Sequence, residues 1–240
     1  MQNSGSLAKF KILSGSMLKL IAVVSMLIDH TAVILRAELA IMETPFFAIG
    51  GIEITLYYVM RQLGRLAFPI FCFLVVEGFF HTRNIKKYAA QLLVFALISE
   101  IPFNLMLRGK FLFPAYQNVY FTLFLGVLLI YIFEHVEGRI KKAILMFAVG
   151  AVAFFLRADY GLEGVLAILL LHLLKNHPAA RALLAFPLFK SKPMALAAFI
   201  PISMYNGQRG FIKSGWLKYG FYIFYPLHMA VLVIIKLILR

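Results

Sequence analysis

Cysteine is almost absent from this chain. Cys72 is the only one in 240 residues, so an intrachain disulfide is excluded. It lies in an apolar run and is expected to be a small buried hydrophobe. The sequence also lacks a Walker motif, a Rossmann glycine pattern, a nucleophile elbow and Cys/His metal spacing. These absences argue against a covalent serine or cysteine enzyme, and no metal is expected.

Charge is scarce too, and negative charge most of all. Only 14% of the residues are charged, with 10 acidic against 24 basic ones, while 62% are hydrophobic. A soluble domain is usually about 45–50% apolar, so this chain has too little polar surface to cover a water-soluble globule. The basic residues fall mainly between apolar runs, as in loops held at an anionic membrane face, which argues against nucleic-acid binding. We therefore expect a polytopic protein of the lipid bilayer.

The apolar runs predict an all-α membrane protein, because a spanning helix needs about 20 mainly apolar residues. We expect a cytoplasmic segment at 1–16 and a single integral membrane domain at 17–240, with seven to nine spans and nine favoured. The stretch 179–206 fits either a hairpin of two short helices or one broken span, and 45–60 fits an interfacial or re-entrant piece. The candidate spans are 17–36, 64–80, 88–107, 118–134, 142–157, 161–174 and 219–239.

Lysine and arginine in the short loops predict the orientation. The basic N-terminus and the loops 81–88, 137–142 and 175–181 are mutually consistent as cytoplasmic. The basic stretch 206–218 joins them only if 179–206 is a hairpin, which favours the hairpin. The first apolar run has a lysine-rich start like a signal peptide, but Asp29-His30 interrupts it and no clear cleavage site follows. We expect a retained first helix, a cytoplasmic N-terminus and a location in the bacterial cytoplasmic membrane.

Ionisable groups inside apolar runs are costly and by default indicate function. Asp29, His30, Glu100 and His228 are the clearest cases. His30, Glu100 and His228 each lie about 10–13 residues, hence roughly 15–20 Å, beyond a basic residue near the start of its run. They are therefore expected at a similar depth in the membrane, although depth does not show that they face one another. Asp29 and His30 point about 100° apart on a helix, so Asp29 is expected to orient another group.

The stretch 61–84 carries the densest set of polar groups. Arg61 and Arg65 are four residues apart and share a helix face, as do Glu77 and His81. At the cytoplasmic end, His81 and Arg83 lie in a basic cluster that could bind phosphates, although membrane anchoring is the better explanation for the lysines there. Arg209 lies in a glycine-containing basic turn, "YNGQRG", which suits a phosphate but also any loop.

Seven motifs, in order from about residue 18 to residue 234, resemble the TraX family. The namesake of that family is linked to acetylation of the N-terminal amino group of conjugative F-pilin. The family also resembles a wider group of integral membrane acyltransferases, which take acyl groups from a cytoplasmic coenzyme A thioester. The motifs are "LKLIAVVSMLIDH", "GRLAFPIFCFLVVEGFFHTRN", "ALISEIPFNL", "NVYFTLFLG", "DYGLEGV", "YNGQRG" and "FYIFYPLHMAVL".

The resemblance implies an acetyltransferase with acetyl-CoA as donor and an amine or hydroxyl of unknown identity as acceptor. His30 would be the general base, with Asp29 tuning it, and His228 matches the histidine of the family's last span. The donor side would be held by basic and polar residues, for which the candidates are Arg65, Glu77, His81, Arg83, Glu100 and Arg209. Two alternatives stay open: a proton-coupled transporter or flippase, and a non-enzymatic membrane assembly subunit.

Overall fold

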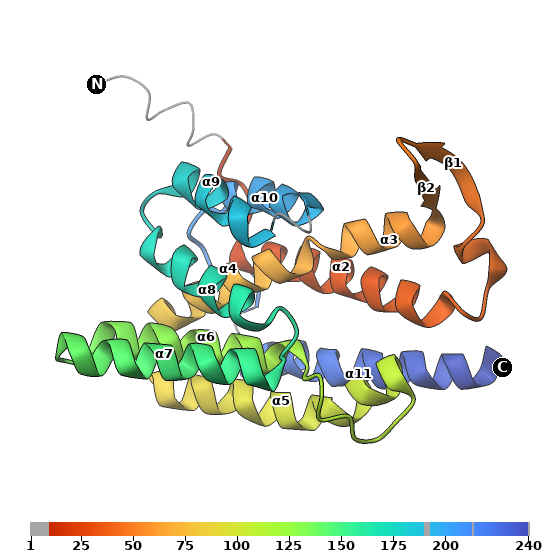
Figure 1. Ribbon diagram of the computed structural model, residues 1–240. Helices are drawn as coiled ribbons and strands as arrows, with labels where there is room; N and C mark the ends of the chain where they lie inside the picture. The colour runs from red at the N-terminus through yellow and green to blue at the C-terminus, as the bar shows by residue number, and fades with distance from the viewer. Residues whose placement is uncertain (1–9, 190–192, 213, 240) are drawn as a thin grey trace.

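The computed structural model describes residues 10–189, 193–212 and 214–239, and within them the chain is almost entirely helical (Figure 1), which confirms the expected fold class. The expected N-terminal segment therefore lies mostly outside the described residues. The α-helices are α2 (Gly15–Leu35), α3 (Leu56–Gly64), α4 (Ala67–His81), α5 (Ile85–Arg108), α6 (Val119–His135), α7 (Arg139–Leu156), α8 (Gly161–Leu173), α9 (Pro178–Phe189), α10 (Phe199–Ser203) and α11 (Gly215–Leu239). Two 3-10 helices, η1 (Ala40–Met42) and η2 (Pro193–Ala198), and two strands, β1 (Pro45–Ile49) and β2 (Ile52–Thr55), complete the set.

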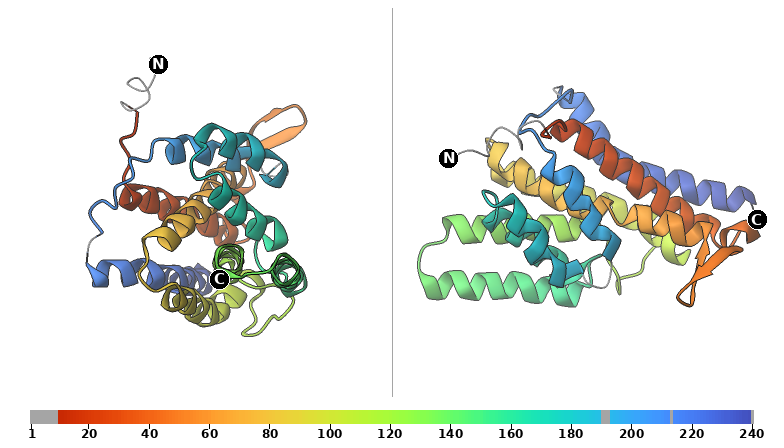
Figure 2. Two further views of the ribbon diagram at one scale, coloured as in Figure 1. Left: turned by 90° about the vertical axis from the view of Figure 1, so that its left-hand side faces the viewer. Right: turned by 90° about the horizontal axis from the view of Figure 1, so that it is seen from above.

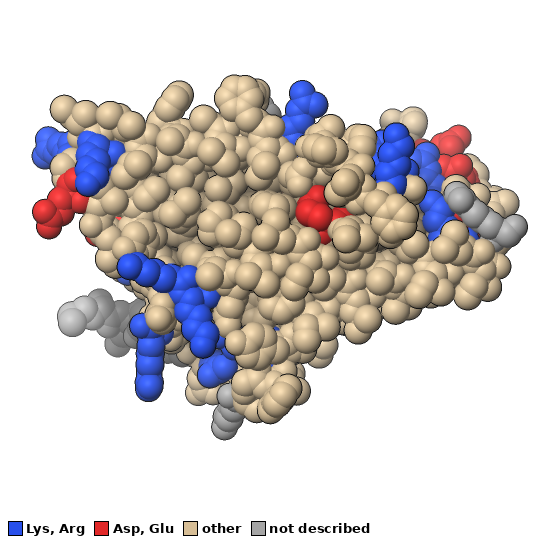
Figure 3. All heavy atoms as spheres, turned by 90° about the horizontal axis from the view of Figure 1, so that it is seen from below, with Lys and Arg blue, Asp and Glu red and all other residues tan. Residues whose placement is uncertain are grey.

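The helices have the length and the surface of a membrane protein. Helix α2, the consecutive pair α3–α4, α5 and α11 are each long and apolar enough to cross a bilayer. Large apolar side chains face outward, and Phe147 and Phe155 of α7 are each 79% exposed. Figure 3 shows most of the lysine and arginine toward the two ends of one face, with a broad, mainly uncharged surface between them that is interrupted by one acidic patch and one basic group at its rim. Lipid, rather than water, suits such a band.

The awkward stretch 179–206 is a hairpin, as the charge pattern favoured. Helix α9 has 12 residues, hence a length of about 18 Å, and is too short for a hydrocarbon core of about 30 Å. Both ends of the stretch lie at the end of the molecule that holds the basic loops 81–88 and 137–142, which we call the basic end. The Arg181 side chain donates to the Leu174 carbonyl at 2.9 Å, and the Asn206 amide donates to the Leu13 carbonyl at 2.9 Å. The count of nine spans stays a prediction.

The apolar piece 45–60 is a β-hairpin followed by the start of α3. Strands β1 and β2 pair antiparallel, and Gly50 and Gly51, with φ of 56° and 80°, form the turn between them. Such a turn needs positive φ at both central residues, which glycine adopts without strain. The hairpin projects at the end of the molecule away from the N-terminus (Figures 1 and 2), and its Phe47 and Ile49 are more than half exposed. The Gly-Gly pair between two β-prone runs was the signal for this hairpin.

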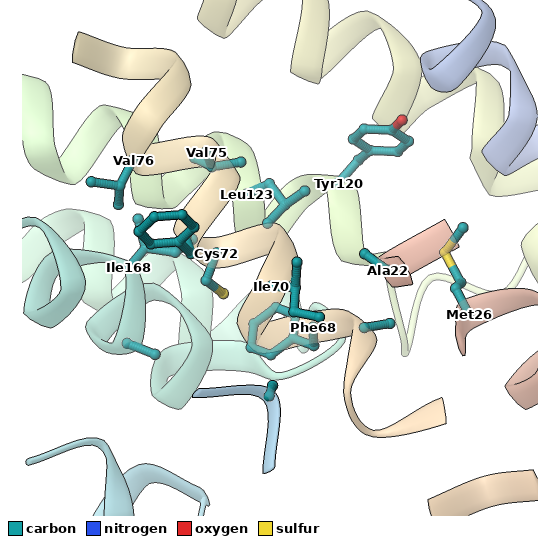
Figure 4. Close-up of a cluster of buried hydrophobic side chains, with 14 of the residues drawn as sticks. Ala22, Met26, Phe68, Ile70, Cys72, Val75, Val76, Tyr120, Leu123 and Ile168 are labelled. Carbon is teal, nitrogen blue, oxygen red and sulfur yellow. The ribbon is translucent and has the colours of Figure 1, made fainter. Parts of the chain in front are cut away.

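Helix α4 lies at the centre of the core. Phe68, Ile70 and Cys72 are at most 3% exposed, which confirms that the single cysteine is a buried hydrophobe. Figure 4 shows α4 side chains packed among residues of α2, α6 and α8, which include Ala22, Met26, Leu123 and Ile168. Because this part of α4 is closely packed on several sides, it holds the residues just before it in place.

Prolines shape two of the helices near the polar groups. The long run 56–81 breaks at Arg65 and Leu66, so that Pro69 falls in the first turn of α4, where its missing N–H costs nothing. In α11, Pro226 leaves the carbonyl of Tyr222 without its helical partner. The hydroxyl of Tyr120 on α6 donates to this carbonyl at 3.3 Å. The freed backbone group thus ties α11 to α6.

Candidate functional site

Two histidines far apart in the sequence meet inside the helical bundle. Nδ1 of His30 on α2 lies 2.6 Å from Nε2 of His228 on α11. The two rings are nearly parallel, with centroids 4.9 Å apart and an angle of 6° between the planes. Tyr225, one turn before His228, is buried, and its ring lies edge-on to the ring of His228 at 5.7 Å. We call His30, His228 and Tyr225 the histidine site.

The hydrogen bonds of this pair assign its tautomers. Nδ1 of His228 lies 2.8 Å from the carbonyl oxygen of Phe224, which can only accept, so this nitrogen carries a proton. Nε2 of a neutral His228 is then an acceptor, and Nδ1 of His30 must donate to it. The remaining nitrogen of His30, Nε2, keeps its lone pair and makes no hydrogen bond within the part of the chain that the structure describes. The geometry thus presents one imidazole as a base and uses the other to orient it.

Contacts near the helix starts confirm the expected common depth. On α2 and α11, Lys19 lies 5.4 Å from the ring of Phe221, so the two helices run in the same direction from a shared level (Figure 2). On α5, the Gln91 amide donates to the hydroxyl of Tyr219 at 2.8 Å. Glu100 lies nine residues after Gln91, and His228 lies nine residues after Tyr219. The three groups therefore share a depth.

Asp29 orients a different group, as its angle to His30 predicted. Its carboxylate accepts from the Arg61 guanidinium at 2.5 Å, and both side chains are about one-fifth exposed. Gly64, one turn after Arg61, makes this approach possible, because a Cβ at that position would overlap Asp29 itself. The ion pair fixes α3 against α2 beside His30. Sequence spacing alone put Arg61 and Arg65 on one face without showing which of them Asp29 binds.

Arg65 reaches a second polar group next to this ion pair. It donates a hydrogen bond to the hydroxyl of Tyr160, whose ring stacks on Phe68 at 3.5 Å between centroids. In the loop before α6, the hydroxyl of Tyr116 donates to the Asp159 carboxylate at 2.7 Å. Burial, and then the Asp159 charge, raise the pKa of Tyr116 well above its ordinary value, so it stays a donor. Tyr116 lies in none of the seven motifs, and Tyr160 lies in "DYGLEGV" without a predicted role, so only the packing identifies them.

Glu100 lies at the right depth but is occupied by other partners. Its carboxylate accepts from the backbone amide of Asn118 at 2.9 Å and from the Asn118 side chain at 2.5 Å. Asn118 in turn begins α6 and donates to the carbonyl of Ala96. Tyr225 lies close enough to feel the charge of Glu100. Glu100 therefore ties α5 to the start of α6 behind the histidine site.

The other predicted site residues lie at the basic end of the bundle. His81, at the end of α4, bonds through Nδ1 to the Glu77 carbonyl at 2.8 Å, and its ring lies 3.9 Å from the Glu77 carboxylate. Burial, followed by the Glu77 charge, raises the pKa of Tyr205, which bonds to Glu77. Arg83 and Arg209 are exposed at this end. Arg65 and Glu77 are 12 residues apart, about 18 Å along the run. The residues at the basic end are therefore separate from those around the histidine site.

Within the described residues, no group of three or more His, Cys, Asp or Glu side chains is arranged to hold a metal ion. The histidine site brings together a neutral imidazole with a free lone pair and a second imidazole that orients it, with two arginines nearby.

The fold and the site thus define a polytopic helical membrane protein with a histidine pair inside its bundle. Its sequence matches the model of the TraX protein family over residues 14–236, so the chain belongs to the TraX family. It is 30% identical to the probable fimbrial assembly protein FimC, serogroup H1, of Dichelobacter nodosus, over 95% of this chain and 97% of that protein. It is also 27% identical to the uncharacterized protein RP591 of Rickettsia prowazekii, over 67% of this chain and 55% of that one. No solved structure matches it.

Proposed function

We propose that this protein is an integral membrane acyltransferase that moves an acetyl group from acetyl-CoA to an amine or hydroxyl of a membrane-associated or exported acceptor. The observation that carries the proposal is the orientation of His30. His228 and the Phe224 carbonyl fix its tautomer so that Nε2 is a base within the bundle. Acetyl transfer to an amine or hydroxyl needs such a base to remove the acceptor's proton.

The residues supply the remaining requirements of the reaction. Nε2 of His30 takes the proton as the acceptor atom attacks the thioester carbonyl, and the resulting imidazolium is stabilised by its bond to His228. Arg65, or the hydroxyl of Tyr160 that it contacts, stabilises the negative oxygen of the tetrahedral intermediate. When the carbon–sulfur bond breaks, the proton passes from His30 to the thiolate and leaves free coenzyme A. The hydrocarbon surroundings keep water from the thioester.

The family relationship supports an acceptor connected with pili or fimbriae. The Dichelobacter relative is named for fimbrial assembly and aligns over nearly its whole length with this chain. An exported protein subunit with a free N-terminal amine would suit the reaction class. Assembly without catalysis is the competing possibility that this relative's name also allows. Assembly without catalysis gives the free lone pair of His30 no role, whereas acetyl transfer uses it as the base.

Transfer of labelled acetyl groups tests the proposal. Membranes of cells that make the protein should incorporate label from radioactive acetyl-CoA into a membrane or exported component, and release coenzyme A in equal amount. The test variant is His30→Ala. His135→Ala is its matched control, because His135 is an exposed histidine at a helix end. Membranes with the folded protein that incorporate no more label than membranes without it would remove the proposal.

We further propose that the basic end faces the cytoplasm, since positive loops stay on that side. Cysteines introduced as Ala48→Cys in the exposed β1 strand and as Lys86→Cys in the basic end test this orientation. In intact cells, an impermeant thiol reagent is expected to label position 48 alone and to reach position 86 only after the membrane is opened. The native Cys72 is fully buried and serves as an unlabelled background. Labelling of position 86 from outside would reverse the orientation.

A further inference from the structure

Three cations meet at the basic end where α2 and α11 begin. Lys19 of α2 lies close enough to Arg209 and to Lys218 of α11 for their charges to repel one another. The ammonium group of Lys19 sits over the ring of Phe221, which covers one of its sides. The ion pairs among the described residues involve none of the three. We call these three residues the cation cluster.

The fold holds this cluster together by backbone contacts. The carbonyl of Arg209 accepts from both the amide of Ser16, at 2.9 Å, and its hydroxyl, at 2.7 Å. The Ser16 hydroxyl accepts in turn from the amide of Ile212 at 2.9 Å. Gly210 has a φ of 83° and packs so closely on Ser14 that a side chain would not fit. The loop is therefore fixed on the start of α2, and the position of Arg209 beside Lys19 follows from it.

Like charges held together in this way destabilise the fold unless an anion neutralises them. Ordinary anchoring at the membrane face does not require three cations to lie together, since separate lysines at loop ends would serve equally well. Ammonium and guanidinium groups bind phosphate by short, charge-assisted hydrogen bonds. A ligand with two or more phosphates would satisfy all three cations at once.

The distance from the cluster to the histidine site fits one particular class of ligand. Lys19 precedes His30 by 11 residues on α2, and Lys218 precedes His228 by 10 on α11, so that both paths measure about 15–16 Å. The pantetheine arm of coenzyme A, from pyrophosphate to sulfur, has about as many backbone bonds as four residues, hence an extended reach of roughly 14 Å. Phosphates at the cluster would place the thioester next to His30.

We propose that Lys19, Arg209 and Lys218 bind the phosphates of an acyl-coenzyme A donor, whose arm runs along the seam between α2 and α11 to the histidine site. The arm and its thioester rest on the proposed function, whereas the phosphate site does not. His81 instead bonds to the Glu77 carbonyl at the end of its own helix, α4. Of the basic-end residues first considered for the donor, Arg209 alone belongs to the cluster.

Binding of adenosine 3′,5′-bisphosphate, the phosphorylated end of the donor without its arm, tests the site directly. Calorimetry is done on the whole protein in nanodiscs of neutral phosphatidylcholine. We expect saturable binding to the native protein, weakened about tenfold or more by Arg209→Gln and by Lys218→Gln, since each removes a charge-assisted hydrogen bond. Arg139→Gln, an exposed cation in the basic loop 137–142, is the control and should bind as the native protein does. Lys19→Met keeps the apolar stem of the more buried cation and should show the same loss.

Two further arms separate the ligand sources and the two proposals. If lipid headgroups were the true ligand, phosphatidylglycerol in the nanodisc would compete with the bisphosphate, and this outcome would overturn a donor site. Loss of binding in Arg139→Gln but not in Arg209→Gln would overturn it as well, and so would no binding to the folded native protein. Cluster-dependent binding without any acetyl transfer would leave the phosphate site standing and remove the proposed function. Acetyl transfer at the native rate in all three cluster variants would support the proposed function and remove the donor site.

Discussion

Replacing His30 with alanine is expected to lower the rate of acetyl transfer about 100- to 10,000-fold, the usual contribution of a positioned general base. The reason is geometric. Nε2 of His30 is the nitrogen of the histidine pair that the hydrogen bonds leave as a free base, since both nitrogens of His228 are engaged. His228 therefore cannot take over the role without breaking its bond to the Phe224 carbonyl. The measurement is the initial rate of label incorporation from acetyl-CoA.

The partner variants separate chemistry from folding. His228→Gln keeps an acceptor for the Nδ1 proton of His30 and is expected to retain more activity than His228→Ala, which leaves the His30 ring free to turn. Binding of adenosine 3′,5′-bisphosphate should be unchanged in His30→Ala, because the cation cluster lies about 16 Å away. A folded His30→Ala protein that transfers acetyl groups at the native rate would show that His30 is not the base.

The common depth of the site residues could be predicted from the sequence, because an α-helix rises by a constant amount per residue. His30, Glu100 and His228 were placed at one level on that basis, and the contacts of Gln91 with Tyr219 confirm it. Which of them face one another could not be predicted. Depth says nothing of rotation about the helix axis, and Glu100 turns out to bind Asn118 rather than a histidine.

Packing between helices explains what the sequence left open. Asp29 pairs with Arg61 because Gly64 lets α3 approach α2 at that point, and no local pattern identifies such a crossing. Lys19 lies in the lysine-rich start of the first apolar run, and its proximity to Arg209 depends on a loop about 190 residues away. Only the tertiary structure brings these distant cations together.

The ion pair of Asp29 and Arg61 leads to the second large expected effect. Arg61→Leu is expected to lower the free energy of unfolding by about 3 kcal/mol, because it removes the positive charge that faces the Asp29 carboxylate in largely apolar surroundings. The double variant Asp29→Asn with Arg61→Leu should recover much of that loss, since no uncompensated charge remains. The measurement is the thermal or denaturant midpoint of the purified protein in one detergent for all variants.

The pair of Arg36 and Glu43 provides a matched control for this test. Its two atoms are 2.6 Å apart, as close as those of the buried pair, but both side chains are more than half exposed. The Glu43 hydrogen bond and charge raise the pKa of Arg36, yet water solvates either partner when the other is removed. Arg36→Gln is therefore expected to leave the midpoint unchanged. Equal effects of Arg36→Gln and Arg61→Leu would mean that Asp29 is solvated in the folded protein. The polar groups around the histidine site would then line a water-filled cavity, and the bilayer would not shield the thioester there.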